Sequence, residues 1–418
     1  MLKGTSSKYK RSVIMLIIFG MLFYYIQCVF SALVMNILTG QGVEATGWSA
    51  TQMTAPVAIS SIIGIVIGFF AMTLLNKYNT KVVSAVFVGV IGLSAALMGL
   101  ALSVNNYVLY YITFFIIRLI YAVPSFAVSA FCGNWFVKTR GQALGIVTIG
   151  APLASATFVS LSTALIANLG IGTTFIGLGV VILVIGVLSV FLLTNTPEDI
   201  GEYPDGAKTA PVVTEEKGDI TIKQVVTSVP GWLSALAFAI LTFAMVCMAA
   251  FFVVIMMTKG YAASVYLPAM AVGAILGIPI SYLLGLVDDK WGTPKACILL
   301  GILSIIGFIG MMTANGTSIL PVIIGVIGYA SMSGGTPNLQ SSLNYYVYGK
   351  KNFLMSYRLA NIPSLVLAAF AATYMASKLE QGQLNQAFIT LIIGTVVAIV
   401  FFIIIGSKPS YDESHGNR

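Results

Sequence analysis

The sequence predicts an all-α integral membrane protein with twelve transmembrane helices in two pseudo-symmetric six-helix bundles. Its composition, the placement of its basic residues and an internal repeat support this. Of the 418 residues, 58% are hydrophobic and only 8% are charged, whereas about 25% are charged in ordinary soluble domains. Apolar stretches long enough to cross about 30 Å of hydrocarbon recur along the whole chain. A membrane β-barrel would instead show segments of roughly ten residues with alternating polarity.

Twelve apolar segments can be placed as spans. Most of the connections between them are short, which favours helices packed as antiparallel neighbours. The predicted spans cover residues 13–39, 50–75, 82–103, 107–134, 141–168, 171–194, 231–257, 264–287, 296–314, 319–347, 353–377 and 384–406.

The basic residues lie mostly on one side of these spans. With the N-terminus in the cytoplasm, most of the 21 lysines and arginines fall in inner loops, and only Lys259 and Lys378 fall outside. This positive-inside bias predicts that both termini are cytoplasmic. The sparse loops favour a prokaryotic cell membrane, that is, a plasma membrane. The net charge of +8 therefore reflects topology, and we expect no nucleic-acid partner.

The residue types that metal sites and catalytic centres need are scarce inside the spans. Four cysteines are scattered without paired spacing, and the single histidine, His415, lies in a polar tail. No paired acids, His/Cys cluster or Ser–His arrangement occurs within a span. We therefore expect no disulfide framework, metal site or cofactor, and no enzymatic activity. The cysteines are interpreted as small packing residues; they are Cys28, Cys132, Cys247 and Cys297.

A polar segment rich in proline, glycine and acidic residues separates six spans from six. It is interpreted as a cytoplasmic linker between two bundles. The predicted organisation is an N-terminal bundle over 1–194, a linker over 195–230, a C-terminal bundle over 231–406 and a cytoplasmic tail over 407–418.

Loop motifs repeat between the two halves. The segment Asn76-Lys-Tyr-Asn-Thr after span 2 matches Asp289-Lys-Trp-Gly-Thr after span 8, and Arg140 after span 4 corresponds to Lys350 after span 10. A duplicated six-span unit is the pattern of a parallel repeat, which builds transporters that bind substrate near the bilayer midplane. The repeat therefore favours a carrier.

The loop after span 8 resembles a signature of the major facilitator superfamily. Gly285-Leu-Val-Asp-Asp-Lys-Trp-Gly-Thr-Pro-Lys295 follows the pattern G-x-x-x-D-(K/R)-x-G-x-x-(K/R). We expect Asp289 to cap or pair with a neighbouring helix end, and the glycines to allow a close helix contact and a tight turn. A corner of this kind can bias a conformational change. The predicted gating residues are Gly285, Asp289, Lys290, Gly292, Asn76 and Arg140.

Shorter elements resemble one branch of that superfamily, the oxalate/formate antiporters and monocarboxylate transporters. Thr196-Pro-Glu-Asp-Ile-Gly-Glu-Tyr-Pro-Asp-Gly206 looks like the P-E-x-x-G-x-x-P-D-G element after span 6, and Asn134-Trp-Phe-Val-Lys-Thr-Arg-Gly-Gln-Ala-Leu-Gly145 resembles N-x-W-F-x-x-x-R-G-x-A-x-G. The resemblance implies transport of small carboxylates by exchange or cotransport. Oxalate exchangers of this branch are thought to use basic residues on spans 8 and 11. Span 8 carries none here, so a monocarboxylate or similar small acid is favoured.

Two arginines lie inside predicted spans, Arg118 in span 4 and Arg358 in span 11. Burying an arginine in a membrane costs at least about 2.5–3.5 kcal/mol on insertion scales, so each needs a partner or water. No aspartate or glutamate lies inside any predicted span. One interpretation is a cationic cavity that a carboxylate completes, since the guanidinium fork matches carboxylate geometry. The alternatives are that Arg118 bonds backbone carbonyls and that Arg358 snorkels to the inner surface.

Other polar residues share helical faces: Tyr24 and Gln27 in span 1, Tyr121 on the Arg118 face of span 4, and Asn361 one turn from Arg358 in span 11. The resemblance to the superfamily implies that the first and fourth helices of each half line the cavity, which favours these residues and those of span 10, such as Tyr329. For each of them an ordinary interhelical hydrogen bond is the alternative to substrate contact. In span 10 we also expect the helix to bend or open at Gly334-Gly335-Thr336-Pro337. The predicted substrate-binding residues are Arg118, Arg358, Tyr24, Gln27, Tyr121, Tyr329 and Asn361.

Together these features predict a secondary active transporter that moves a small organic anion by alternating access, as an antiporter or a substrate/proton symporter. Because the spans lack an acid or a histidine, we expect no side-chain proton relay. The alternatives are a multidrug/proton antiporter, which would need a membrane acid, and a non-transporting membrane sensor. The expected partners are the small anionic substrate and the lipid bilayer, and the chain is expected to be monomeric.

Overall fold

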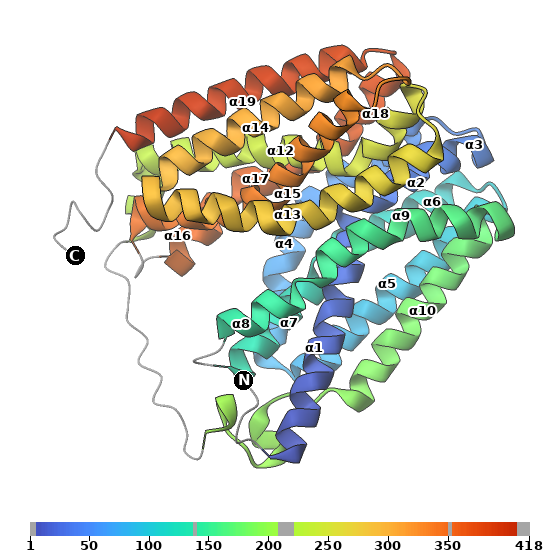
Figure 1. The fold of residues 1–418 in the computed structure, drawn as a ribbon. Coiled ribbons are helices and arrows are strands. Elements are labelled where there is room, and N and C mark those ends of the chain that lie inside the picture. Colours follow the sequence, from blue (N-terminus) through green and yellow to red (C-terminus); the bar gives the residue numbers. More distant parts are fainter. Residues whose placement is uncertain (1–5, 137–139, 208–220, 350–352, 408–418) are drawn as a thin grey trace. The chain divides into compact units, whose positions relative to one another are not determined.

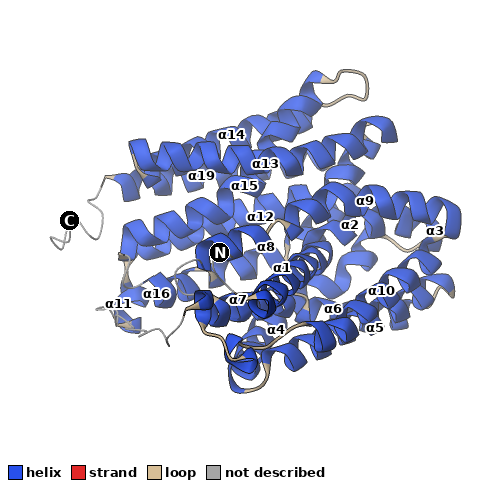
Figure 2. Cartoon of the chain, turned by 60° about the horizontal axis from the view of Figure 1, so that its bottom comes forward, coloured by secondary structure: helices blue, strands red, loops and turns tan. Residues whose placement is uncertain are grey.

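The chain folds into helices and connecting turns, as its composition predicts. All regular structure in the described residues is helical (Figures 1 and 2). By internal contacts the chain divides into two compact units, Met1–Trp48 with Ala55–Thr214, and Ser49–Thr54 with Glu215–Arg418. The computed structural model describes residues 6–136, 140–207, 221–349 and 353–407.

The first span is longer than predicted, because one helical segment runs from Ser7 to Thr46. Two five-residue π-helices interrupt its α-helical course, at Val29–Leu33 and Leu38–Gly42. The α-helices of the first half are α1 (Ser7–Cys28), α2 (Val34–Ile37), α3 (Val43–Thr46), α4 (Ala50–Lys77), α5 (Thr80–Ser103), α6 (Tyr107–Ile120), α7 (Val123–Trp135), α8 (Arg140–Val147), α9 (Gly150–Leu169) and α10 (Ile171–Leu192).

Glycines allow α5 and α10 to pack closely along their length (Figure 1). A Cβ on Gly92 would lie 2.8 Å from the Gly179 carbonyl oxygen, and one on Gly99 would lie 2.6 Å from the Gly172 carbonyl oxygen. In a membrane there is no hydrophobic force between helices, so association depends on such close backbone approach. The seven-residue spacing of these glycines therefore fixes the pairing of the two helices.

The beginning of the predicted linker is ordered against the first unit. Two short 3₁₀ turns, Pro197–Ile200 and Pro204–Gly206, follow α10. Trp135 Nε1 donates to the Asn195 carbonyl oxygen at 3.3 Å. Gly201 has a φ of 74°, a left-handed conformation that favours glycine. The proline- and glycine-rich motif thus forms a compact cap at the end of α7.

The second unit buries its core between long helices. Phe238 of α12 and Phe402 of α19 have ring centroids 5.4 Å apart, and Leu300 of α14 and Leu339 of α15 are fully buried in the same cluster. The helices of the second half are α11 (Ile222–Thr227), α12 (Val229–Thr258), α13 (Ala263–Trp291), α14 (Thr293–Thr313), α15 (Leu320–Tyr348), α16 (Phe353–Ala360), α17 (Ile362–Ala369), α18 (Ala371–Glu380) and α19 (Leu384–Gly406).

Eleven helices among the described residues are long and apolar enough to cross a membrane. The predicted span that is not among these eleven, span 10 (319–347), coincides with α15, which is 29 residues long and carries polar side chains through its middle. Besides the interrupted first span, three predicted spans consist of more than one helix. Span 4 comprises α6 and α7, span 5 comprises α8 and α9, and span 11 comprises α16, α17 and α18.

For span 10 the sequence predicts a helix that bends or opens; the opening is wrong, and the bend stays a prediction. α15 stays helical through Gly334-Gly335-Thr336-Pro337, so the helix does not open there. The glycines serve packing instead, because a Cβ on Gly334 would overlap the Gly277 carbonyl of α13, and one on Gly335 would lie 2.5 Å from Leu284 Cδ1. Close approach between α13 and α15 explains this glycine pair.

Candidate functional site

Arg118 lies in the last turn of α6 and is only 3% exposed. Its Nη1 donates to the carbonyl oxygens of Phe30 and Ser31, the latter at 2.8 Å, and its Nη2 donates to Ser61 Oγ at 2.8 Å. The guanidinium carbon lies 4.4 Å from the centroid of the Tyr121 ring. The buried Nε has no hydrogen-bond partner among the described residues. Arg118 therefore connects α6 to α4 and to the first span.

Local departures from regular helix bring the hydrogen-bond partners of Arg118 close to its guanidinium. The π-helix Val29–Leu33 has wider turns than an α-helix, so its carbonyls leave the α-helical ladder and can accept from a side chain. α6 ends at Ile120 because Pro124 has no N–H to continue the ladder. A Cβ on Gly64 would lie 3.0 Å from the Leu119 carbonyl oxygen. This glycine therefore lets α4 approach α6 closely.

Neutral groups stabilise the buried charge of Arg118. Its partners are backbone carbonyls, a hydroxyl and an aromatic ring, and no carboxylate of the described residues pairs with it. A desolvated cation–π contact is worth about 2 kcal/mol, which is comparable to the insertion cost of an arginine. The backbone-bonded arrangement that the sequence left open is the one seen here. Contact with a substrate stays a prediction.

The other predicted residues of the first bundle are Tyr24 and Gln27 on α1 and Tyr121 at the end of α6. The Tyr24 hydroxyl is hydrogen-bonded to Ser129 of α7, and Gln27 is half-buried one turn further along. Tyr121 is the residue at which α6 ends, so its ring faces the guanidinium from the break in span 4. The structure therefore brings Tyr121 to Arg118 and leaves Tyr24 bonded to α7.

Sequence reasoning missed the partners that α4 and α9 supply. Besides Ser61, these are Thr157, whose hydroxyl lies 3.1 Å from the Tyr25 hydroxyl, and Ser155, whose hydroxyl lies 3.7 Å from Cys28 Sγ. These two are among several hydroxyl side chains of α9, so the sequence gives no signal that singles them out. Ser61 had no signal either, since it follows another serine in a span without charge.

A second polar cluster lies in the second unit. Gln340 of α15 donates through Nε2 to Asn361 Oδ1 at 3.0 Å and to Ser364 Oγ at 3.2 Å. Asn361 occupies the break between α16 and α17, which the following Pro363 imposes. The backbone of Arg358 belongs to α16, and its side chain lies outside the described residues. The cluster therefore flanks the helix that carries the second predicted arginine.

Tyr329 lies deep in the second unit. It is 2% exposed, and its ring lies 5.7 Å from that of Phe252. A Cβ on Gly273 would lie 2.8 Å from its Cδ1, so α13 approaches it closely. In this structure Tyr329 is a packed aromatic, and its role as a substrate contact stays a prediction.

The turn after α13 has the conformation that its glycine pattern predicts. Gly292 ends the helix with a φ of 87°, which a residue with a side chain rarely adopts. At Gly285 a Cβ would meet only Asn338 Nδ2, at 3.8 Å, so packing does not require this glycine. The tight turn is therefore present, and the close helix contact expected at Gly285 is not.

The charged groups of this corner differ from expectation in one respect. Asp288 caps the turn, because its Oδ1 accepts from Thr293 Oγ1 at 2.6 Å. Lys290 is exposed. Sequence reasoning passed over Asp288, because the signature places its acid one residue later. The side chains of three predicted gating residues lie outside the described residues: Asn76, Arg140 and Asp289.

Comparison with known proteins decides the family. A family model described as Major Facilitator Superfamily matches residues 12–351. The chain belongs to the Major Facilitator Superfamily.

Two crystal structures of a bacterial homolog to the human lysosomal transporter Spinster resemble this major facilitator protein. One is in an inward-facing and unoccupied conformation and the other in an inward-facing and occupied conformation. They align with a TM-score of 0.68 at 12% and 13% identity, and in both cases cover 96% of this chain and 98% of that chain. At these identities the likeness concerns the fold. No curated protein matches the sequence.

Membership of the Major Facilitator Superfamily makes the chain a multi-pass membrane transporter and not an enzyme. The predicted fold class, a twelve-helix major facilitator fold, is confirmed by the family and by the structural match over nearly the whole chain. The resemblance drawn from the loop after span 8 is thus correct for the superfamily.

Proposed function

We propose that this major facilitator protein is a secondary transporter that moves a small organic anion by alternating access. The observation that carries the proposal is Arg118, a guanidinium that is buried in a span and whose partners among the described residues are all neutral. A buried charge without a counter-charge is costly, and a carboxylate is the ligand that would offset it. Its Nε, which has no hydrogen-bond partner in the described part of the chain, supplies a further donor for such an oxygen.

We propose that a substrate carboxylate replaces some of the neutral hydrogen-bond partners of Arg118 when it binds. Hydrogen bonds to a charged acceptor are roughly twice as strong as neutral ones. A carboxylate can therefore displace the Ser31 carbonyl or Ser61 from the guanidinium, and those groups can return to it when the substrate leaves. A site that alternates between two sets of partners suits a carrier, which must both bind and release its ligand.

In the second bundle we propose that Asn361 and Arg358 contact the substrate. Gln340 supports Asn361 through a side-chain hydrogen bond at 3.0 Å, which sets the direction of its amide. In the first bundle we propose the same role for Tyr24, Gln27 and Tyr121, and in the second also for Tyr329. The two bundles, 1–194 and 231–406, are proposed as the parts that rock, with 195–230 as their linker.

The substrate we favour is a monocarboxylate or a similar small acid. The resemblance to the oxalate/formate and monocarboxylate branch supports this, as does the lack of a basic residue in span 8. Since no acid or histidine lies within the predicted spans, the coupling we propose is exchange, or a proton carried on the substrate itself. We further propose a monomer in a prokaryotic plasma membrane with both termini cytoplasmic, as the charge distribution predicts.

The test is a thermal-shift screen of the purified full-length protein. Small mono- and dicarboxylates are compared with amines of the same size, in wild type and in Arg118→Lys, which keeps the charge but lacks the guanidinium fork. At least one carboxylate should raise the Tm by mass action, and Arg118→Lys should bind it at least about tenfold more weakly, a difference of about 1.4 kcal/mol. Stabilisation by amines alone would instead favour multidrug efflux.

A further inference from the structure

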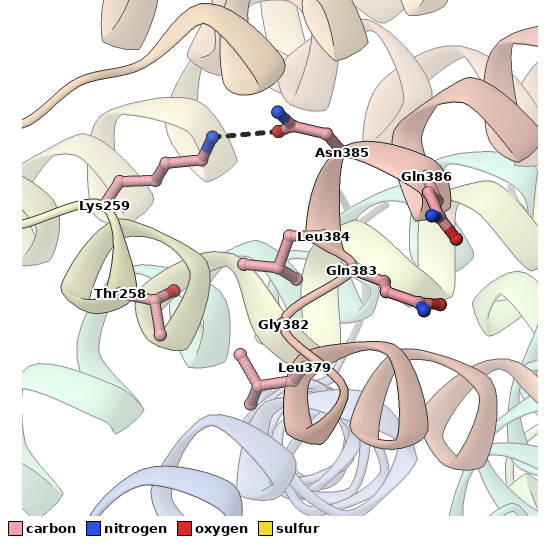
Figure 3. Close-up of a pocket in the computed structure, with 8 residues that line it drawn as sticks. All are labelled: Thr258, Lys259, Leu379, Gly382, Gln383, Leu384, Asn385 and Gln386. Carbon is pink, nitrogen blue, oxygen red and sulfur yellow. Dashed lines mark hydrogen bonds between the residues drawn. The ribbon is translucent and has the colours of Figure 1, made fainter.

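A polar depression lies where α12 and α18 end and α19 begins, within the second unit (Figure 3). Its volume is about 470 Å³, within the range of small-molecule sites. Lys259 points across it toward Asn385 (Figure 3). The residues that line it are Thr258, Lys259, Leu379, Gly382, Gln383, Leu384, Asn385 and Gln386, none of which is acidic.

Of the two lysines that fall outside in the predicted topology, Lys259 lines this depression, and Lys378 bonds to Gln383, one of its lining residues. Lys259 Nζ donates to the Met312 carbonyl at 3.0 Å and to Asn385 Oδ1 at 3.1 Å, and Lys378 Nζ donates to Gln383 Oε1 at 2.8 Å. All of these acceptors are neutral. Both positive charges are therefore uncompensated within the described part of the chain.

Glu380, which follows Lys378 by two residues, is bonded elsewhere. The Glu380 carboxylate accepts from the backbone N–H of Thr51 and, at 2.8 Å, from the Thr51 hydroxyl, within the same unit. Burial lowers the pKa of Lys259 below its ordinary value of 10.5, as expected for an ammonium that lacks a counter-ion. An anion at this position would supply the missing partner.

The two amides that accept from lysines leave hydrogen-bond donors at the depression. Each amide oxygen of Gln383 and Asn385 is taken by a lysine, which leaves their NH₂ groups to face other partners. The backbone N–H groups of the first turn of α19 add to these donors, since they have no acceptor within their helix. A ligand that only accepts hydrogen bonds fits such a lining.

We propose that this depression is an oxyanion-binding site, for a carboxylate or phosphate group, held by Lys259 and the amides of Gln383 and Asn385. The group can belong to a soluble anion or to the headgroup of an anionic lipid, because the predicted topology places the depression at the outer surface. The proposal does not depend on the substrate of the transporter. It also explains why two lysines stand on the side where basic residues are otherwise absent.

Lys259 also has a structural role that any test must separate from binding. Met312 lies in the last turn of α14, where carbonyl oxygens lack helical partners, so Lys259 stabilises that helix end. Replacing the lysine would remove both functions at once. Asn385→Asp separates them, since a carboxylate 3.1 Å from Nζ retains the lysine and neutralises the site.

The experiment titrates the full-length protein in non-ionic detergent with inorganic phosphate and with acetate, at constant ionic strength made up with chloride, and records the Tm. Wild type is compared with Asn385→Asp, Lys259→Gln and Lys223→Gln, the last being an exposed lysine of the predicted inner side. In parallel, the protein is reconstituted into vesicles of phosphatidylcholine and into an equimolar mixture with phosphatidylglycerol. If an anion also binds at Arg118, the Tm rise that it causes there is the same in all four proteins. That contribution therefore cancels when the proteins are compared.

We expect a saturable rise of the wild-type Tm that Lys223→Gln keeps. Asn385→Asp should retain the basal Tm, and both it and Lys259→Gln should bind at least about tenfold more weakly. A rise with phosphate or acetate identifies a soluble ligand, and a rise only with phosphatidylglycerol identifies a lipid headgroup. Equal shifts in wild type and Asn385→Asp, or no shift with any of the probes, would overturn the proposal.

Discussion

Arg118 depends on one side-chain hydrogen bond that can be removed cleanly. Ser61 accepts from its Nη2 at 2.8 Å, so Ser61→Ala leaves a charged donor buried without an acceptor. Such a loss costs about 1–3 kcal/mol, and the Tm of the purified protein should fall accordingly.

The neighbouring Ser60 is a matched control for this prediction. It is fully buried but bonds only carbonyls of its own helix, those of Pro56 at 2.6 Å and Val57 at 3.1 Å. Removal of such a bond leaves the helical ladder intact, so Ser60→Ala should lower the Tm less than Ser61→Ala. Equal losses in the two variants would show that the bond to Arg118 contributes nothing.

In the second unit, Gln340 holds two residues of span 11. Gln340→Leu leaves Asn361 Oδ1 and Ser364 Oγ without their donor, and we expect a loss of about 1–3 kcal/mol in the free energy of unfolding. Ser341→Ala is the control, because Ser341 bonds only the Pro337 carbonyl of its own helix, at 3.2 Å. It should stay within about 0.5 kcal/mol of wild type. The same stability for both variants would contradict the cluster's role.

At this scale the sequence could show where a buried charge lies but not what it bonds. Arg118 stands out because a charge in an apolar segment is rare and functional. Its partners depend on how closely α4 approaches and on the carbonyls that a π-helix exposes, and no residue type signals either. The choice of Asn361 as a candidate followed from its one-turn spacing to Arg358. Ser364 joins the polar cluster around Gln340 only because Pro363 breaks the helix, which the spacing does not show.

Close helix packing makes Gly150 the most sensitive glycine that we can test in the first unit. A Cβ there would overlap the Met21 carbonyl oxygen, so α1 and α9 would have to separate in Gly150→Ala. Overpacking of this kind costs about 1–3 kcal/mol, which a lowered Tm would report.

Gly177 of α10 provides the opposite case. A Cβ there would meet nothing within 4 Å, so Gly177→Ala should raise stability by about 0.5–1 kcal/mol, because alanine loses less backbone entropy in a helix. If both glycine variants changed the Tm in the same direction, close packing at Gly150 would not be the cause.

The positions of the helices were predictable, but their interruptions were only partly so. Prolines mark the breaks in spans 4 and 11, since Pro124 and Pro363 cannot continue the hydrogen-bond ladder. The π-helices of the first span contain no proline and could not be predicted. Pro337 misled in the other direction, because packing of α15 on α13 keeps the helix whole around it.

The orientation of the whole molecule can be tested with single cysteines. Gln381 and Lys223 are both exposed, and the positive-inside bias places the first outside and the second in the cytoplasm. In intact cells a membrane-impermeant maleimide should label Gln381→Cys but not Lys223→Cys, which should react only after permeabilisation. The native cysteines give little background, as three are buried and Cys28 is half-buried. Labelling of Lys223→Cys but not of Gln381→Cys in intact cells would show that the topology is the opposite of the predicted one.

The family and the twelve-helix fold were predictable because hydropathy, charge placement and the duplicated loops act over the entire chain. The substrate was not, because in our proposal it depends on a few side chains around two arginines. The most direct test of the anion proposal is counterflow of a labelled small carboxylate, chosen from the thermal-shift screen, into proteoliposomes preloaded with the same compound. We predict uptake by wild type that exceeds protein-free liposomes and is lost in Arg118→Gln. Undiminished uptake in a folded Arg118→Gln protein would contradict the account.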